Sequence, residues 1–278
     1  MLAISRRPPA LGYHLSPFTF HLSPFTFRPN HHPKLLDPPK LSRLPSRPEQ
    51  EDEDSIPMDI TAERARFNMI QQQIRPWDVL DDRVLEAMSE VRREAFVPDA
   101  YQGLAYADIE IPIGEGACML APKVVGRMLQ ALAVQPGERV LEIGAGTGYV
   151  SACLARLGGR VIGVEIDAGL ADEARARLAG LGLESIEIRT GDALSEPVEG
   201  GPFDVIAVTG SMPTEAALPL LQGQLANGGR LFCILGVEPV MEALLLTRVG
   251  DRGFRREGLF ETATLALKNA AEADAFEF

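Results

Sequence analysis

The stretch VLEIGAGTGY, residues 140–149, places three glycines at alternate positions behind a short apolar run. Glycines in such a loop let a ligand approach the backbone closely, and that ligand can be a phosphate, a dinucleotide or a phosphate-free molecule. A phosphate loop has Lys and then Ser or Thr after its last glycine, whereas Tyr149 follows Gly148 here. The dinucleotide fingerprint G-x-G-x-x-G is one residue longer than the spacing of Gly144, Gly146 and Gly148. The loop therefore favours a ligand without phosphate.

Three acidic side chains follow a pattern that fits such a ligand. Glu142 lies two residues before Gly144, where its charge would oppose a pyrophosphate and suit an ammonium group. Glu165 ends the next apolar run, 21 residues after Gly144, and can accept two hydrogen bonds from a ribose diol. Asp192, followed by Ala193, closes a third run and can accept a hydrogen bond from the exocyclic amine of adenine. Glu165 or Asp192 alone could equally cap a helix or lie in solvent. Together, an amino-acid end, a ribose and an adenine describe S-adenosylmethionine.

The distribution of histidine limits the available chemistry. All four histidines lie in residues 1–57, so residues 58–278 contain none. A Ser-His-Asp triad, a His-ligated metal site and imidazole base catalysis are thereby excluded from that part of the chain. Its chemistry must need little proton transfer, or take it from carboxylates, lysine or tyrosine.

Residues 58–278 are strongly acidic, with 20 basic against 33 acidic side chains and a net charge of −13. Such a surface repels phosphate backbones and disfavours a nucleic-acid partner. Cys118, Cys153 and Cys233 lie far apart without metal-ligand spacing, which predicts free thiols in a reducing compartment and no metal. No apolar run reaches the ~18 residues of a membrane span, so we expect a soluble chain without a membrane partner.

Residues 1–57 differ in composition from the rest. They hold 11 of the 21 prolines and a tandem copy of HLSPFTF, at 14–20 and 21–27. A Pro-rich segment without hydrophobic periodicity cannot bury enough surface to offset its ordering entropy, so we expect a disordered extension. The prolines also oppose the amphipathic helix of a transit peptide. An alternative is that Met58 is the true start of the protein.

Strand and helix patterns alternate from residue 138 onward. The expected strands cover 139–144, 160–167, 185–190, 203–211, 230–236, 243–249 and 262–267, with a helix at 213–226 and a turn at 227–229. Strands separated by helices predict an α/β fold with a doubly wound, mostly parallel seven-stranded sheet. Ligands of such a sheet bind at the carboxyl ends of its first strands.

Helical patterns precede these strands. One follows Asp82, a candidate N-cap, and another begins at Pro122, where a helix tolerates proline. We therefore expect an N-terminal helical substrate or cap region over 58–136 and a cofactor-binding core over 137–278.

Two sets of motifs carry a resemblance to known families. VLEIGAGTGY, VIGVEID, GDA, FDVIAVTG and LANGGRLFCILG resemble the successive motifs of class I S-adenosylmethionine-dependent methyltransferases. The flanking stretches VLEAMSEVRREAFVP, YADIEIPIGEG, LLLTRV and GFRREGLFE resemble the protein-L-isoaspartate O-methyltransferase family, over about residues 62–267. The resemblance implies a cytoplasmic repair enzyme that methylates the isoaspartyl carboxylate of damaged proteins.

The expected substrate loop departs from the family's pattern. Where the family has a threonine and a serine that helps hold the substrate carboxylate, this chain has Cys118 and Leu120. The departure leaves open a weakened or redirected methyltransferase, or a cofactor-binding protein that transfers no methyl group. Lys123 and Thr209 are candidates to hold or align the reacting carboxylate, with Ser211 as a weaker one. The alternatives are a solvated lysine and ordinary turn hydroxyls.

Overall fold

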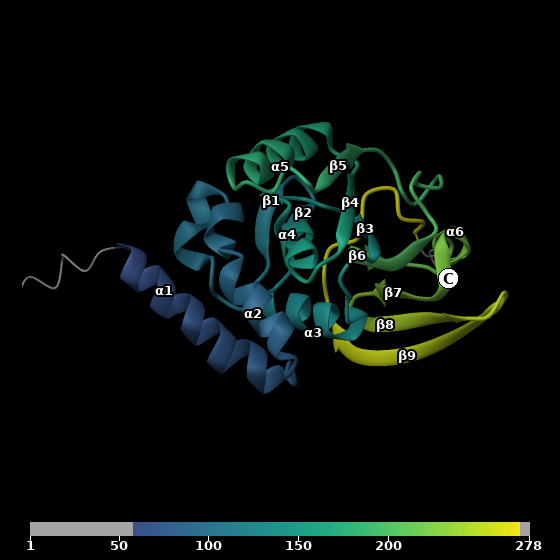
Figure 1. Cartoon of the computed structure of the whole chain (residues 1–278), viewed down its shortest axis with the longest axis horizontal. Helices are drawn as coiled ribbons and strands as arrows, with labels where there is room; N and C mark the ends of the chain where they lie inside the picture. The colour runs from purple at the N-terminus through teal and green to yellow at the C-terminus, as the bar shows by residue number, and fades with distance from the viewer. Residues whose placement is uncertain (1–57, 273–278) are drawn as a thin grey trace, which may run out of the picture. The chain divides into compact units, whose positions relative to one another are not determined.

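The computed structural model describes residues 58–272 (Figure 1). Side chains are described from residue 61 onward. The extension predicted for residues 1–57 lies outside the described residues, and the alternative start at Met58 stays a prediction. The described part contains a seven-stranded sheet, the helices that cover it and a separate two-stranded hairpin. None of its helices has the length and apolar content that crossing a bilayer requires.

The central sheet has the strand order β5-β4-β3-β6-β7-β8-β9. The five strands β5, β4, β3, β6 and β7 run parallel to one another. At the edge next to β7, β8 pairs antiparallel with β7 and β9 pairs antiparallel with β8. The bounds are β3 Arg139–Ile143, β4 Arg160–Glu165, β5 Glu187–Thr190, β6 Phe203–Met212, β7 Leu225–Val237, β8 Val240–Val249 and β9 Gly253–Thr262. The predicted fold class, a doubly wound and mostly parallel seven-stranded sheet, is confirmed.

Successive side chains of the central strands face opposite sides of the sheet. On β3, Val140 belongs to one hydrophobic cluster and Leu141 to another; on β6, Val205 and Ile206 divide in the same way. Because both faces are buried, these strands appear in the sequence as nearly continuous apolar runs. By this alternation, Glu142 lies on the same face as Val140.

Helices cover the two faces of the sheet. The bounds are α3 Pro122–Leu132, α4 Tyr149–Arg156, α5 Ala168–Gly180 and α6 Leu218–Gly223. Residues of α3, α4 and α5 pack in the cluster that contains Val140, whereas α6 packs in the cluster that contains Leu141. Figure 1 shows α5 beside β5 and α6 near the amino end of β7. The helix predicted to begin at Pro122 is confirmed.

The chain before the sheet is helical apart from one hairpin. Its elements are α1 Met58–Asn68, the π-helical η2 Met69–Ile74, the 3₁₀ turns η3 Arg75–Trp77, η4 Arg93–Phe96 and η5 Asp99–Leu104, the helix α2 Asp82–Glu90, and the strands β1 Ile111–Gly114 and β2 Ala117–Met119. The N-cap of α2 is Asp81 and not the predicted Asp82, because the Asp81 carboxylate accepts a hydrogen bond from the N–H of Arg83. Met88 and Val125 share a hydrophobic cluster with residues of the sheet, so packing does not separate residues 58–136 from residues 137–278. The predicted division into a substrate region and a cofactor-binding core stays a prediction about function.

Three predicted elements differ from the structure. The helix predicted over 213–226 is limited to α6, and the turn predicted at 227–229 belongs to β7, where a register shift against β6 absorbs the extra residues. The strand predicted over 262–267 is wrong, since β9 ends at Thr262. The chain then returns to the central strands, where Ala266 forms an isolated parallel bridge with Ser211.

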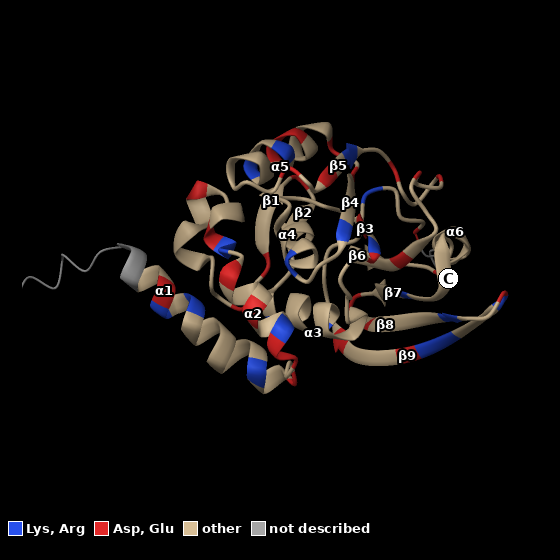
Figure 2. Cartoon of the chain, in the orientation of Figure 1, with Lys and Arg blue, Asp and Glu red and all other residues tan. Residues whose placement is uncertain are grey.

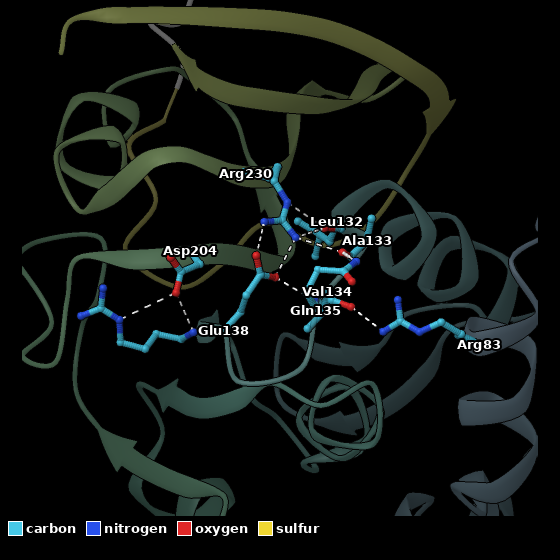
Figure 3. Close-up of polar contacts among 9 residues, drawn as sticks. Arg83, Leu132, Ala133, Val134, Gln135, Glu138, Asp204 and Arg230 are labelled. Atoms are coloured by element: carbon cyan, nitrogen blue, oxygen red, sulfur yellow. Dashed lines mark hydrogen bonds and ion pairs between the residues drawn. The ribbon is translucent and has the colours of Figure 1, made fainter. Parts of the chain in front are cut away.

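Polar contacts fix the connection between α3 and β3 (Figure 3). Arg230 on β7 forms an ion pair with Glu138 at 2.7 Å and donates to the carbonyl oxygen of Leu132. Arg83 on α2 donates to the carbonyl oxygen of Val134 at 2.6 Å. These contacts satisfy carbonyl groups that the end of α3 leaves unpaired. They hold the start of β3, whose other end carries the glycine loop.

Charged residues lie mainly on the helices and at the strand ends (Figure 2). On α5 the acidic Asp172 and Glu173 precede the basic Arg175 and Arg177, so the helix carries both signs of charge. The central strands are almost free of charge, which makes the acids at their carboxyl ends stand out.

Candidate functional site

The glycine loop joins the end of β3 to the start of α4. Gly144 and Gly146 have φ angles of +89° and +52°, in the left-handed region that favours glycine. A Cβ atom at Gly144 would lie 2.8 Å from the side chain of Leu267, and one at Gly146 would lie 2.9 Å from Ile113. Both positions therefore require glycine for conformation and for space. Gly148 ends the loop as the N-cap of α4.

The backbone donors of the loop point into the protein. The N–H groups of Gly144 and Ala145 donate to the carbonyl oxygen of Val164 at 2.9 and 3.1 Å. The N–H of Gly146 donates to Oε2 of Glu165 at 2.8 Å. A phosphate-binding loop presents such N–H groups to its ligand. This geometry supports the prediction of a ligand without phosphate.

An open cleft with about 690 Å³ of empty volume lies at the carboxyl ends of β3, β4 and β6. Its place is that of small-molecule sites in open parallel sheets. The predicted cofactor residues that line it are Gly144, Gly146, Glu165, Asp192 and Ala193. Gly148 and Glu142 are not among its lining residues.

Glu165 ends β4 and is only 7% exposed. Its Oε1 accepts a hydrogen bond from the N–H of Asp167 at 3.0 Å, and its Oε2 accepts the bond from Gly146. A carboxylate has about four acceptor sites, so each oxygen can still accept from a ligand. The two backbone donors fix the orientation of the carboxylate at the wall of the cleft.

Asp192 follows β5 and caps the turn behind it. Its Oδ1 accepts from the N–H of Leu194 at 3.0 Å, and its Oδ2 accepts from Ser195 Oγ at 2.5 Å and from Asn269 Nδ2 at 3.3 Å. Partial burial acts to raise the pKa of Asp192, but the hydrogen bonds from Ser195 and Leu194 outweigh it and lower the pKa. The carboxylate is thus held ionised, and it both caps a turn and lines the cleft.

Glu142 is buried, 1% exposed, on the face of β3 that α4 covers. Its Oε2 accepts a hydrogen bond from Ser151 Oγ, while its Oε1 has no partner among the described residues. Burial raises the pKa of Glu142 to about 8, against the bond from Ser151 and together with repulsion from Glu165. An unpaired buried carboxyl oxygen is compatible with an ammonium group, and the assignment of Glu142 to the cofactor stays a prediction.

Glu142 lines a second, smaller cavity with about 310 Å³ of empty volume. This side cavity shares Ile113, Cys118, Gly144, Gly146 and Thr209 with the main cleft, so the two spaces adjoin. A ligand in the cleft can therefore extend one end towards Glu142.

The structure separates the two catalytic candidates. Thr209 lines both spaces, and its hydroxyl lies 2.8 and 2.6 Å from the carbonyl oxygens of Ile143 and Gly144, of which it can donate to one. Lys123 lines neither space; its Nζ lies 2.8 Å from Asp108 Oδ2 and 4.5 Å from the centre of the Trp77 ring.

The weaker candidate, Ser211, also lies away from both spaces. Its side chain is fully buried, and its hydroxyl donates to the carbonyl oxygen of Thr264 at 3.1 Å. Ser211 therefore ties the C-terminal segment to β6.

The loop around β2 brings the two unusual residues to the site. Cys118 lines both spaces, and Leu120 lines the side cavity with a side chain 3% exposed. Burial and then the nearby carboxylate of Glu110 raise the pKa of the Cys118 thiol to about 11, so the thiol stays neutral. Neither residue provides the hydroxyl that the resemblance implies.

Two groups of residues at the site were missed by the sequence reasoning. Arg93 and Tyr149 line the side cavity, and the segment Thr264–Lys268 lines the main cleft. The segment was expected as a strand, and nothing in the local sequence shows that it returns to the cleft. Lys268 Nζ lies 3.3 Å from Asp167 Oδ2, which ties the segment to the start of α5.

Comparison with known proteins identifies the family. Residues 64–253 match the model of the family described as Protein-L-isoaspartate(D-aspartate) O-methyltransferase (PCMT). The protein-L-isoaspartate O-methyltransferase of Methylorubrum populi is 45% identical over 192 residues, which cover 68% of this chain and 88% of the relative. The chain belongs to this family. A more distant member, from Aeropyrum pernix, is 39% identical over 216 residues, covering 69% of this chain and 82% of that relative.

Solved structures of this PCMT family share the fold. One protein-L-isoaspartate O-methyltransferase superimposes with a TM-score of 0.65 at 24% identity, covering 76% of this chain and 67% of the other. A Plasmodium falciparum beta-aspartate methyltransferase (PCMT), in complex with S-adenosyl-L-homocysteine, gives a TM-score of 0.63 at 22% identity, with 74% and 98% covered. The PCMT match over 64–253 includes the glycine loop and its three acids, whereas the cleft-lining segment Thr264–Lys268 lies beyond it.

Proposed function

We propose that this chain is an S-adenosylmethionine-dependent carboxyl O-methyltransferase that acts on L-isoaspartyl residues of damaged proteins. The observation that carries the proposal is the 45% identity to a protein-L-isoaspartate O-methyltransferase over 88% of that relative's length. Independent support comes from the cleft at the carboxyl ends of β3 and β4, where the N–H groups of the glycine loop donate to the protein and not to a phosphate site.

The residues of the cleft fit the cofactor. Glu165 has free acceptor sites for a ribose diol, and Asp192 with Ala193 lies one strand further along for the adenine. The unpaired Oε1 of Glu142 in the adjoining side cavity fits the ammonium group of the amino-acid end. Gly144 and Gly146 let the loop pass close to Leu267 and Ile113 at the wall of the cleft, where a larger residue would not fit.

When bound, S-adenosylmethionine supplies an electrophilic methyl group on its sulfonium. The accepting isoaspartyl carboxylate is already ionised at neutral pH, so no group of the protein has to remove a proton from it. This agrees with the absence of histidine from residues 58–278. The protein's contribution is to align the carboxylate with the methyl carbon and to exclude water.

Thr209 and Cys118 are placed to shape that alignment, because both line the junction of the cleft and the side cavity. We propose Thr209 as the residue that fixes the loop end at the transfer position, through its hydrogen bond to the end of β3. Lys123 would have to leave Asp108 to act there.

Loss of the substrate-loop serine changes the expected efficiency and not the reaction. One hydrogen bond to a charged carboxylate is worth ~1.5–3 kcal/mol, or roughly 10- to 150-fold. The comparisons do not favour a methyltransferase with another substrate, or a cofactor-binding protein that transfers no methyl group. The relatives at 39–45% identity are named protein-L-isoaspartate O-methyltransferase.

The decisive experiment measures methyl transfer from labelled S-adenosylmethionine to an isoaspartyl peptide and to the same peptide with ordinary aspartate. We expect transfer to the first and not to the second, together with calorimetric binding of S-adenosylhomocysteine. Binding without transfer to any isoaspartyl peptide would reject the substrate, and absence of binding would reject the cofactor.

We further propose a cytoplasmic location and a substrate-facing role for residues 58–136. The free thiols Cys118, Cys153 and Cys233 support a reducing compartment. The β1–β2 hairpin, which lies within residues 58–136, lines both spaces of the site and supports the substrate-facing role.

A further inference from the structure

The side cavity gathers unpaired polar atoms. Four buried side-chain oxygen or nitrogen atoms of the described residues lack a hydrogen-bond partner, and three of them belong to side chains that line this cavity. They are Nη1 of Arg93, the hydroxyl of Tyr149 and Oε1 of Glu142. Unpaired buried polar atoms are costly and rare, so their concentration in one cavity points to a polar ligand.

Arg93 is held rigidly in place. It is 0% exposed; its Nε donates to the carbonyl oxygen of Ala105 at 3.0 Å and its Nη2 donates to that of Leu120 at 2.9 Å. Its guanidinium carbon lies 4.9 Å from the centre of the Tyr149 ring. Two of the three guanidinium nitrogens are thus fixed by the backbone. The third, Nη1, has the Tyr149 side chain as a polar neighbour but no well-formed hydrogen bond among the described residues.

The positive charge of Arg93 has no counter-ion of its own. Within residues 58–272, no carboxylate forms an ion pair with Arg93. The charge of Asp108 acts on Arg93 from a longer distance, but Asp108 is itself paired with Lys123 at 2.8 Å. Glu142 lines the same cavity, but its raised pKa keeps it largely protonated at neutral pH. A buried charge without a partner is strongly unfavourable, and an anionic ligand would remove that cost.

We propose that Arg93 is a carboxylate-binding residue, and that its Nη1 receives a carboxylate oxygen in the side cavity. The inference rests on the proposed function, which brings two carboxylates to this site. One belongs to the methyl-accepting side chain, and the other to the amino-acid end of the cofactor. An arginine suits either, because its rigid donors match carboxylate geometry.

The position of the cavity supports this assignment. Arg93 donates to the backbone of Leu120 at the end of the β2 loop, and the cavity shares Cys118 and Thr209 with the cleft. A carboxylate on Nη1 therefore lies beside the space in which the methyl group is transferred.

The test compares Arg93→Gln and Arg93→Lys with Arg83→Gln. Arg83 is the control, since it also donates to two carbonyl oxygens, those of Val134 and Leu157. Unlike Arg93, it is exposed, and it lies at the other end of the sheet. For each variant we would measure the KM for an isoaspartyl peptide and the Kd of S-adenosylhomocysteine. A third quantity is the Kd of methylthioadenosine, which lacks the amino-acid end.

If Nη1 binds the acceptor, Arg93→Gln raises the KM by about 10- to 150-fold, with both Kd values unchanged. The variant also loses the preference for a carboxylate over a carboxamide peptide as inhibitor. If Nη1 binds the cofactor, the Kd of S-adenosylhomocysteine rises by that factor and the Kd of methylthioadenosine does not. Arg93→Lys keeps part of either effect. A response no larger than that of Arg83→Gln in all three quantities would overturn the inference.

The role of Arg93 can also be tested if the variant does not fold or if the unaltered chain shows no transfer. If Arg93→Gln does not fold, a crystal structure of the unaltered chain with S-adenosylhomocysteine and an isoaspartyl peptide decides the matter. A carboxylate oxygen at hydrogen-bond distance from Nη1 supports the inference, and water there with both carboxylates elsewhere rejects it. If the unaltered chain transfers no methyl group, the proposed function fails, while the two Kd values still test Arg93 alone.

Discussion

The backbone N–H of Gly146 donates a 2.8 Å hydrogen bond to Oε2 of Glu165. This bond joins the glycine loop after β3 to the acid at the end of β4, so the two sequence motifs form one rigid unit. The same contact directs a loop donor to the protein and leaves the other acceptor sites of Glu165 at the cleft.

Replacing Glu165 with alanine should weaken cofactor binding. The change removes an acceptor for the ribose and leaves the N–H of Gly146 without its partner. We expect the Kd of S-adenosylhomocysteine to rise by roughly 10- to 150-fold, the equivalent of one or more hydrogen bonds to a charged group. Titration calorimetry gives the Kd, and Glu184→Gln, on the exposed loop before β5, is the control. An unchanged Kd would remove Glu165 from the site.

The raised pKa of Glu142 predicts a pH-dependent stability. Its folded-state value of about 8 lies above the ordinary 4.5. Between these values the folded protein binds more protons than the unfolded chain, so the free energy of unfolding falls as pH rises. Glu142→Gln removes this loss, and its stability relative to the parent should increase from about pH 5 to about pH 8. Urea denaturation across that range provides the measurement, with Glu184→Gln, on the exposed loop before β5, as the control.

Ligand affinity should also depend on the ionisation of Glu142, but it should rise with pH where the stability falls. An ammonium group binds the ionised form of Glu142, so the affinity of S-adenosylhomocysteine should rise as pH approaches 8. The Glu142→Gln variant should lose this dependence. An identical pH profile in both proteins would contradict the contact with the ammonium group.

The ion pair between Arg230 and Glu138 should contribute to stability and not to binding. Both side chains are mostly buried, and Arg230 also satisfies the carbonyl oxygen of Leu132. We expect Arg230→Met to lower the free energy of unfolding by ~1–3 kcal/mol, since it leaves these acceptors unpaired. The Kd of S-adenosylhomocysteine at a temperature where the variant is folded should not change. A change in Kd without loss of stability would show that this end of β3 affects the cleft.

The loop and the strands could be predicted because their signals are local. Left-handed glycines, apolar runs buried on both faces and acids at strand ends are each encoded within about ten residues, as at Gly144 and Glu165. Asp82 was proposed as the cap of α2 in place of Asp81 because neighbouring acids offer the same side-chain oxygen, and only the backbone geometry distinguishes them.

The remaining features depend on contacts between distant residues. Thr264 and Ala266 reach the cleft because their segment pairs with Ser211 on β6, more than 50 residues earlier in the chain. Arg93 is an ordinary arginine in the sequence, and its role follows only from the cavity that the β2 loop and α4 form around it. Lys123 was a reasonable candidate by position, but the structure pairs it with Asp108.

Replacing Leu120 with serine tests whether a hydroxyl in the substrate loop improves transfer. Leu120 is 3% exposed beside the side cavity, so both Leu120→Ser and Leu120→Ala should lower the free energy of unfolding by ~2–5 kcal/mol through the space they create. Only serine adds a donor for the substrate carboxylate. We therefore expect kcat/KM for an isoaspartyl peptide to be roughly 10- to 150-fold higher in the serine variant than in the alanine variant. Equal values in the two variants would mean that the carboxylate is held elsewhere, and Arg93, which donates to the backbone of Leu120, is the residue to which that result would point.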